Sequence, residues 1–507
     1  MSISATEPRP FPMTFGGGLD QSADPLFIPL DRVAAVQDMG FEQKVAAKRL
    51  GFQNEGTGTI SGTIQARFDY ITNAGTQFPM AISSQGAYYK SGGAWTLLQT
   101  LTGIPGTPIS WINFNGILIW TNQQANQIYK WTGSGAAALL GGSPPQAAQY
   151  LLSYQNVVMA FGVTDGSSVF HPFRVQWTDN GNQDQWASGE AGLNDLFGTG
   201  STFQGVGLVG PYGALLRRDS IWVIQPAPAP FYFSFSSTSS GKGCIAPGSI
   251  QSIDQGVIYC GDGMLYVFNG IDSVPVGQPA FSYLRTVNYN ALGSIVSANY
   301  PLRGEYYIAL PVSGATSPNL VLELDYLEGY VTAYSLVVTA LGIELQPLIS
   351  WSDPFLSNAT WGGSGLQWGD PTFAGGAPSL VGANVSQPTI QGPTYDDFGN
   401  PISASLTTRL TDLGQAGIKR VPRIQIVLAK QTTGTVTIVV GTSDDGSTIT
   451  SSSPHTVSMV GSTAAFFETD DLPEAEWFNF TISNAQVDVG LAVKMLIPYF
   501  IPRESSL

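Results

Sequence analysis

The hydrophobic and polar positions of this chain alternate over short stretches, and they seldom recur every three or four residues as they would in a helix. Residues 86–90 and 94–98 are typical, each rich in aromatic or aliphatic side chains, with Ser91-Gly92-Gly93 between them. Such stretches fit a pleated, half-buried strand, and the Gly-rich breaks mark turns. The pattern therefore predicts an all-β fold.

Hairpin-like units recur along much of the chain. In each unit, a strand rich in aromatic residues leads through a Gly or Asn turn into a second strand. Five of them occupy residues 109–120, 150–161, 206–216, 257–270 and 303–310. They lie roughly 40 to 60 residues apart, which is the length of a four-stranded propeller blade. We therefore expect a β-propeller-like domain, with a stacked array of β-sandwiches as the alternative.

Two segments depart from this repeat. Residues 31–50 carry a poor apolar stripe, made up of Val33, Val36, Val45 and Ala46, that predicts the one helix of the chain. Residues 350–393 are dense in Gly, Ser, Trp and Pro, and we expect them to form long loops that close the last blade.

Alternating strands resume near Ile402 and indicate a C-terminal β-sandwich of about 100 residues. The predicted organisation is an N-terminal arm (residues 1–52) that contributes to a docking platform, a β-propeller-like domain (residues 53–400) and a C-terminal β-sandwich (residues 401–507).

The chain carries little charge, and that charge is mostly negative. Charged residues make up 11% of its 507 residues, against about 25% in an ordinary soluble domain. The 21 Lys and Arg face 36 Asp and Glu, a formal net charge of −15. Tight nucleic-acid binding needs a basic stripe, so a protein that grips DNA is disfavoured. An acidic protein along which DNA slides without sticking is compatible with this balance.

Residues for common catalytic or metal chemistry are scarce. His171 and His455 are the two histidines; the first precedes a proline in a strand context, and the second is expected in a loop. Motifs for a serine hydrolase, a zinc protease, a phosphate-binding loop or a CxxC pair are lacking. We therefore predict no catalytic, cofactor-binding or metal-binding residues, no cofactor and no enzymatic activity.

Three weaker signals allow either a binding role or a purely structural one. Residues 442–449 fit part of an Asp-box around Asp445, but Asp-Gly is also a common hairpin turn. Residues 179–184 resemble a calcium loop but lack its Gly and Glu, which favours a polar turn. Trp361 and Trp368 could stack on sugar rings, although tryptophans are more often core or interface residues. The structural interpretation is preferred for all three.

Cys244 and Cys260 are the two cysteines. A pair in a chain of this length does not form a disulfide scaffold, so two buried free thiols are expected, with a single cross-strand disulfide as the alternative. No secretory signal is recognised, and no apolar run approaches the ~18 residues of a membrane span.

Three segments, in this order, resemble the β-propeller "nozzle" (tail tubular, or head-to-tail stabilisation) proteins of short-tailed bacteriophages. The first is residues 15–29, opening Phe-Gly-Gly-Gly-Leu-Asp, followed by Lys-Arg-Leu-Gly-Phe at 48–52. The second is residues 206–224 with Phe-Tyr-Phe-Ser-Phe at 231–235. The third is Gly-Cys-Ile-Ala-Pro-Gly-Ser at 243–249, followed by residues 256–270, and it is the most specific of them.

The resemblance covers residues 14–52 and 170–335. It implies a structural protein of the virion tail, assembled in the cytoplasm of the bacterial host as a homohexameric ring. Such a ring lies below the portal and the tail adaptor ring, contacts tail fibres or spikes, holds the genome in, and conducts double-stranded DNA during ejection without binding it specifically. Blade number, gating loops and interface residues are left open.

Two other functions are the alternatives to this one. The first is a carbohydrate-binding or polysaccharide-depolymerising tail protein on a propeller scaffold, which would need a cleft with paired carboxylates if it cleaved glycans. The second is a cellular scaffold propeller, which would be a monomer where a nozzle forms a ring.

Overall fold

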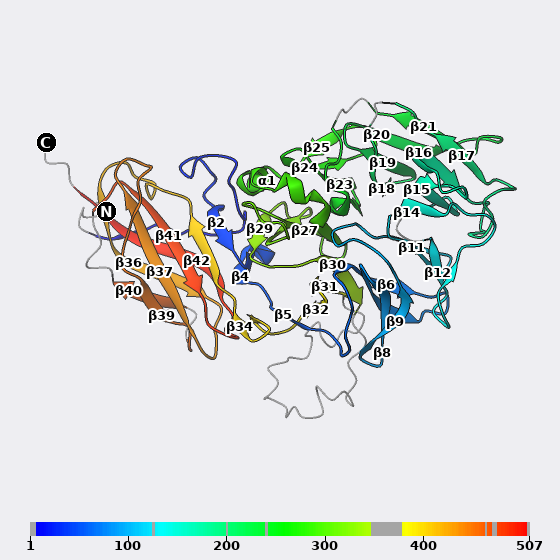
Figure 1. Ribbon diagram of the computed structural model, residues 1–507. Coiled ribbons are helices and arrows are strands. Elements are labelled where there is room, and N and C mark those ends of the chain that lie inside the picture. The colour runs from blue at the N-terminus through cyan, green and yellow to red at the C-terminus, as the bar shows by residue number, and fades with distance from the viewer. Residues whose placement is uncertain are drawn as a thin grey trace.

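The computed structural model describes residues 7–123, 127–198, 201–238, 242–345, 378–461, 464–468 and 474–503. Strands dominate it and form a β-propeller beside a β-sandwich (Figure 1). The predicted all-β class and the propeller-like domain are therefore confirmed. Within the described residues the propeller consists of seven four-stranded sheets, here called blades 1 to 7.

The strands of each blade follow one another in sequence, except in the last. Blade 1 holds β6 (Ile64–Ile71), β7 (Gln77–Ser83), β8 (Gly86–Ser91) and β9 (Ala94–Thr100); blade 2 holds β10 (Ser110–Phe114), β11 (Ile117–Thr121), β12 (Tyr129–Trp131) and β13 (Ala138–Leu139); blade 3 holds β14 (Ala147–Tyr154), β15 (Val157–Thr164), β16 (Phe170–Trp177) and β17 (Gly192–Asp195). Blade 4 holds β18 (Phe203–Val209), β19 (Tyr212–Arg217), β20 (Ile221–Pro226) and β21 (Phe233–Ser237); blade 5 holds β22 (Gln251–Ile253), β23 (Gly256–Gly261), β24 (Met264–Phe268) and β25 (Ser273–Pro275); blade 6 holds β26 (Val296–Tyr300), β27 (Glu305–Leu310), β28 (Leu320–Asp325) and β29 (Val331–Tyr334).

Blade 7 closes the ring with a strand from far upstream. Its strands β30 (Ala340–Leu345), β31 (Pro378–Asn384) and β32 (Gln387–Gln391) are followed at the outer edge by β5 (Phe52–Asn54). β32 and β5 are antiparallel, with Ile390 opposite Gln53. Because the outer strand comes from before blade 1, the two ends of the propeller are joined by backbone hydrogen bonds.

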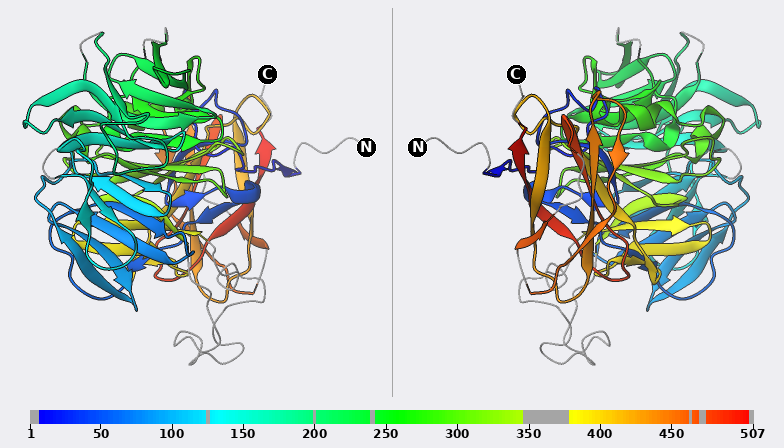
Figure 2. Two further views of the ribbon diagram at one scale, coloured as in Figure 1. Left: turned by 90° about the vertical axis from the view of Figure 1, so that its right-hand side faces the viewer. Right: turned by 90° about the vertical axis from the view of Figure 1, so that its left-hand side faces the viewer.

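The sandwich consists of two six-stranded sheets drawn from both ends of the chain (Figure 2). One sheet holds β1 (Arg9–Pro10), β3 (Met39–Gly40), β4 (Ala46–Lys48), β36 (Lys419–Leu428), β40 (Ala464–Glu468) and β42 (Ala492–Pro502); the other holds β2 (Val33–Gln37), β35 (Ala404–Thr408), β37 (Thr435–Ser443), β38 (Thr450–Ser451), β39 (His455–Ser458) and β41 (Trp477–Asn484). The N-terminal residues thus supply strands to both sheets. A small hairpin of β33 (Asp396–Asp397) and β34 (Asn400–Pro401) precedes β35.

Helices are short in the described residues. They are η1 (Glu42–Lys44), η2 (Pro247–Ser249), η3 (Gln278–Ala280), α1 (Phe281–Arg285) and η4 (Tyr289–Ser294). None of the helices described is long and apolar enough to cross a membrane.

The prediction of a helix within residues 31–50 is wrong. This segment forms strands β2, β3 and β4, with one 3₁₀ turn between β3 and β4. Strand β2 carries a bulge between Val33 and Ala35, so that Val33 and Val36 both point into the core. A bulge shifts the two-residue alternation by one position, and the resulting spacing of three imitated a helix.

Two smaller expectations also need correction. The segment 350–393, expected as long loops, contains strands β31 and β32 at its end, and its residues up to 377 lie outside the described part. His455 is the first residue of strand β39, where a loop was expected.

The core is divided among the blade interfaces, each filled by side chains of two neighbouring blades. Trp120 of blade 2, for example, is fully buried in a cluster with Phe68 and Tyr70 of blade 1. The largest cluster unites the sandwich core with side chains of blades 5 and 6, such as Ile308 and Leu322. Sandwich and propeller therefore share one continuous hydrophobic core.

Candidate functional site: the domain junction and the central cavity

The first segment of the resemblance lies where the sandwich meets blade 6. The backbone N–H of Leu19 donates to the carbonyl oxygen of Val331 at 2.8 Å. Val331 belongs to β29, the outermost strand of that blade. Gly18 has a φ of +70°, and a Cβ there would come within 2.7 Å of the Cβ of Tyr330. A glycine is thus required at position 18 by a close approach to blade 6 and a left-handed conformation.

Lys48 and Arg49, from the second part of that segment, lie at the domain junction. Lys48 makes its contacts within the sandwich, whereas the guanidinium of Arg49 lies 5.9 Å from the ring centroid of Tyr334 in blade 6. Arg49 Nε lies 2.6 Å from Asp38 Oδ1, and Arg49 Nη2 lies 2.6 Å from Asp397 Oδ2. Lys48 Nζ donates to Asn484 Oδ1 in the sandwich at 3.0 Å, and burial, followed by the nearby Arg49, lowers the pKa of Lys48 to about 8. Arg49 is almost fully buried, so this bridge is part of the interior of the molecule.

Asp38 ties the same bridge to blade 6. Its backbone N–H donates to Ala333 O at 2.9 Å, and its carboxylate accepts from the backbone N–H of Ser335 at 3.1 Å. Burial raises the pKa of Asp38, although Arg49 opposes this effect. The junction is therefore held by backbone hydrogen bonds and buried ion pairs in addition to its apolar core.

The Gly-Cys-Ile-Ala-Pro-Gly-Ser segment forms the turn that leads into blade 5. The hydroxyl of Ser249 donates to Ala246 O at 2.6 Å and accepts from the backbone N–H of Cys260 at 2.9 Å. A Cβ on Gly248 would lie 2.0 Å from Ile295 O, in the residue just before the first strand of blade 6. This segment therefore packs blade 5 against blade 6, and its residues serve the fold.

Cys244 and Cys260 are both buried free thiols in this structure. Cys244 Sγ lies 3.2 Å from Ala246 O. Burial raises the pKa of the Cys244 thiol to about 12, and it raises the pKa of Cys260 as well. Neutral, enclosed thiols are poor nucleophiles.

The ring closure contains a buried ionic cluster of Glu55, Arg67, Lys90 and Glu344. Arg67 Nη2 is 2.9 Å from Glu344 Oε2 and also binds Glu55, and Lys90 Nζ is 2.9 Å from Glu344 Oε1 and contacts Glu55 as well. The Arg67 guanidinium lies 4.8 Å from the ring centroid of Trp95. The two cations come from blade 1, and the two carboxylates come from blade 7 and from the segment after β5. Their charges thus neutralise one another.

The two acids of this cluster differ in their acidity. Burial, followed by the charge of Glu55, raises the pKa of Glu344 to about 7. Burial also opposes ionisation of Glu55, but Arg67 and Lys90 outweigh it, so the pKa of Glu55 is lowered. Near neutral pH, Glu344 is the member of the cluster that gains or loses a proton.

A second buried carboxyl, Glu323 of β28, lies in blade 6. It accepts hydrogen bonds from the hydroxyls of Tyr330, at 3.1 Å, and Tyr334. Burial, followed by the nearby Glu305, raises the pKa of Glu323 to about 8. Tyr334 is the last residue of β29, and Tyr330 directly precedes this strand. The two hydrogen bonds therefore hold β29, the strand of blade 6 that contacts the sandwich, against β28.

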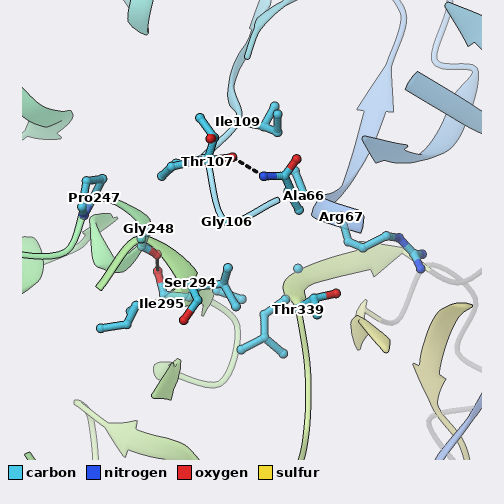
Figure 3. Close-up of a pocket in the computed structure, with 18 of the residues that line it drawn as sticks. Ala66, Arg67, Gly106, Thr107, Ile109, Pro247, Gly248, Ser294, Ile295 and Thr339 are labelled. Atoms are coloured by element: carbon cyan, nitrogen blue, oxygen red, sulfur yellow. Dashed lines mark hydrogen bonds between the residues drawn. The ribbon is translucent and has the colours of Figure 1, made fainter. Parts of the chain in front are cut away.

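The central cavity of the propeller is lined by the first strand of every blade and by the loops that lead into them. Figure 3 shows part of this lining. Its volume is about 950 Å³. Arg67 and Asp69 are the charged residues among those that line it. The Arg67 side chain extends away from the cavity into the ionic cluster, and Asp69 Oδ2 accepts from Gln77 Nε2 at 2.9 Å. The cavity therefore offers neutral polar and apolar groups.

The polar residues considered from sequence lie apart from this cavity. His171 Nε2 is 2.9 Å from Asp165 Oδ2, a pair on blade 3. Asp445 accepts from the backbone N–H of Ser447 at 2.8 Å and of Thr448 at 2.7 Å, and these bonds lower its pKa. Such bonding is that of a turn, as expected for residues 442–449.

The calcium-like segment 179–184 is likewise a turn. Asp179 accepts from the backbone N–H of Glu190 at 2.8 Å, and Asp184 accepts from the backbone N–H of Gly141 at 2.6 Å and pairs with Lys130. Within the described ranges, no group of three or more His, Cys, Asp or Glu side chains is placed to hold a metal ion. Trp361 and Trp368 lie outside the described residues.

No protein-family model and no curated protein matches this chain. Among solved structures, a catalytically inactive virginiamycin B lyase from Staphylococcus aureus is similar at 12% identity, with a TM-score of 0.39 over 67% of this chain and 99% of the lyase. The extracellular domain of a putative one-component system from B. thetaiotaomicron is similar at 10% identity, with a TM-score of 0.40 over 75% of this chain and 43% of the other. PorZ, a component of the type-IX secretion system of Porphyromonas gingivalis, is similar at 10% identity, with a TM-score of 0.34 over 70% of this chain and 42% of PorZ. All three TM-scores are below 0.5, so no function is carried over from these proteins.

The buried ionic residues were not recognised from the sequence. One signal for them exists, because a charged residue within a strand of hydrophobic neighbours is uncommon in a chain with only 11% charged residues. Arg67 stands between Ala66 and Phe68, and Glu323 stands between Leu322 and Leu324. Buried charged groups of this kind are normally paired or hydrogen-bonded. Each such residue therefore predicts that a partner group exists, but not which residue provides it.

Proposed function

We propose that this chain is a structural, non-enzymatic protein of a bacteriophage tail, of the nozzle type. In this proposal six copies form a ring below the portal and the tail adaptor ring, with tail fibres or spikes at its sides. The ring surrounds the DNA exit channel, retains the genome, and conducts it during ejection. The sequence resemblance over residues 14–52 and 170–335 is the source of the proposal.

The observation that carries the proposal is the way the sandwich is joined to the propeller. A ring around a pressurised DNA channel must keep its domains in fixed positions. Here the N-terminal residues supply strands β1–β4 to the sandwich and then strand β5 to blade 7. Arg49 pairs with Asp38 and Asp397 at this crossing. Force applied to the sandwich is therefore transmitted to the propeller through paired strands and a shared core instead of a flexible linker.

The charge and the cavity agree with this role. A net charge of −15 repels the phosphates of DNA and keeps friction low in a channel between subunits. The cavity of one propeller, at about 950 Å³, is the size of a small-molecule site, for which ~300–1,000 Å³ is typical. The channel for the duplex is therefore assigned to the space enclosed by the ring of subunits.

Electron microscopy of the purified protein tests the proposal. Negatively stained particles should average into rings with sixfold symmetry. Duplex DNA added at physiological salt should bind with a dissociation constant no tighter than about 10⁻⁴–10⁻⁶ M, the range of non-specific binding. A monomer at all concentrations, a ring of another order, or tight DNA binding would each contradict it.

A further inference from the structure

The central cavity has an aromatic platform at its wall. Trp111 of β10 stacks on Phe68 of β6, with ring centroids 3.8 Å apart and an angle of 9° between the planes. Phe68 is 4% exposed, whereas Trp111 is 37% exposed, and both line the cavity. Because Trp111 belongs to an inner strand, its exposed surface faces the cavity. A tryptophan fixed by stacking on one side and accessible elsewhere offers a rigid apolar surface to a ligand.

Two glutamines of the cavity wall offer hydrogen-bond acceptors. Gln65 Nε2 donates to Thr107 O at 2.6 Å and Ile104 O at 3.1 Å. Gln251 Nε2 donates to the carbonyl oxygen of Ser297 at 3.1 Å and to its hydroxyl at 3.2 Å. These bonds fix each amide so that its nitrogen is occupied, and Oε1 is left as the acceptor for a ligand. A ligand that uses these oxygens must bring O–H or N–H donors.

The two charged side chains of the cavity wall are held by neighbouring groups of the protein. Arg67 is paired with Glu344 at 2.9 Å, and Asp69 accepts from Gln77 and from the backbone N–H of Leu345 at 2.5 Å. A phosphate or carboxylate ligand would therefore find no available cation among the described lining residues. A nucleic acid is disfavoured for the same reason. The one carboxylate of the lining, Asp69, uses Oδ2 for both of these bonds, and its Oδ1 has no hydrogen-bond partner but is buried, out of reach of an ammonium ligand. The ligand that fits these walls is uncharged.

We propose that this cavity binds a neutral oligosaccharide. One pyranose ring stacks its C–H face on Trp111 of blade 2, and hydroxyls along the oligosaccharide donate to Oε1 of Gln65 in blade 1 and of Gln251 in blade 5. A sugar combines the apolar face and the ring of O–H donors that this wall requires. The volume of about 950 Å³ lies at the upper end of the usual range for small-molecule sites, ~300–1,000 Å³, so that more than one sugar unit is accommodated. A peptide fits less well, since its carbonyls need donors and both amide nitrogens are occupied.

Ligand-observed NMR and calorimetry test this site with three neutral probes: maltotriose, cellotriose and chitotriose. At least one should bind with a dissociation constant of about 1 mM or tighter, which corresponds to about 4 kcal/mol of binding free energy. Trp111→Ala should weaken that binding at least tenfold. Phe231→Ala is the matched control, because Phe231 is an aromatic residue, 72% exposed, that does not line the cavity. Its binding should equal that of the unmodified protein.

Two further variants guard against a loss of fold. Gln65→Met and Gln251→Met keep the side-chain length and remove the acceptor, and each should weaken binding about threefold to tenfold, roughly one hydrogen bond. Thermal unfolding of every variant identifies any that are not folded. The proposal is overturned if none of the three trisaccharides binds, if folded Trp111→Ala binds as the unmodified protein does, or if trigalacturonate or a capped tripeptide binds in preference to them. None of these outcomes depends on whether the chain forms a ring.

Discussion

Arg67 in blade 1 and Glu344 in blade 7 form a fully buried ion pair, 2.9 Å between Nη2 and Oε2, although 277 residues separate them in the chain. Arg67 also donates to the carbonyl oxygen of Gly382 in blade 7 at 3.2 Å. The first and last blades are thus joined by side chains at the inner strands and by β5 at the outer edge. A propeller without a covalent closure depends on such contacts to remain a ring.

Arg67→Met should destabilise the propeller strongly. The substitution leaves Glu55 and Glu344 buried with only Lys90 as a cation, and removal of one partner from a buried pair costs about 3–5 kcal/mol. Urea unfolding followed by tryptophan fluorescence measures this loss. Arg503→Met is the control, because its pair with Glu474 is 65% and 43% exposed and such pairs contribute about 0–1 kcal/mol. Equal effects of the two substitutions would show that the cluster does not hold the ring.

Glu323→Gln should make the protein less sensitive to alkaline pH. The pKa of Glu323 is raised from an ordinary 4.5 to about 8 in the folded protein. The folded state therefore holds this proton more tightly than the unfolded state does, and the associated stability is complete at low pH. It is lost as the pH rises toward 8, by up to roughly 1.4 kcal/mol per pH unit.

Thermal unfolding at several values between about pH 5 and pH 9 measures this dependence. The Glu323→Gln variant should lose less stability over the range than the unmodified protein does. Glu328→Gln, an exposed substitution of the same type in the same blade, should leave the slope unchanged. The remaining slope of the Glu323 variant should reflect the other carboxyls whose pKa burial raises, among them Glu305 and Glu344, the latter with a pKa of about 7. Parallel profiles for all three proteins would contradict the assignment of Glu323.

The blades were predictable from sequence, but what joins them was not. The unit 257–270, for example, forms β23 and β24 as expected, because each of its strands carries its own alternation and its own turn. The helix predicted within residues 31–50 failed because the bulge at Val33 and Ala35 is set by the partner strand β35. The ionic cluster and the Trp111–Phe68 platform depend on contacts between blades, for which local patterns carry no information.

Arg49→Met should separate the unfolding of the sandwich from that of the propeller. The substitution leaves the carboxylates of Asp38 and Asp397 without their shared cation at the domain junction, at a cost of about 3–5 kcal/mol. Differential scanning calorimetry should show a single transition for the unmodified protein and two for the variant. Lys494→Met replaces an exposed cation on the sandwich strand β42, so its calorimetric trace should match the original. A single, unshifted transition for Arg49→Met would argue against a mechanical role of the bridge.

Gly248→Ala should disturb the contact between blades 5 and 6. The added Cβ would lie 2.0 Å from Ile295 O, and backbone on both sides limits relaxation. Overpacking of this kind costs about 1–3 kcal/mol. Gly166→Ala is the control, since a Cβ there meets nothing within 4 Å and its backbone is not left-handed. Chemical denaturation should place Gly166→Ala near the unmodified protein; a similar position for Gly248→Ala would show that the turn can move.

Cys244 and Cys260 should not react with an aromatic disulfide reagent in the folded protein. Both are buried, and burial raises the pKa of Cys244 to about 12 and also that of Cys260, so the thiolate that attacks the reagent is scarce at neutral pH. After denaturation, both thiols should titrate rapidly, and the count distinguishes free thiols from a disulfide because a bonded pair would give none. Rapid reaction in the native state would mean that blade 5 opens to solvent far more readily than its position between blades 4 and 6 allows.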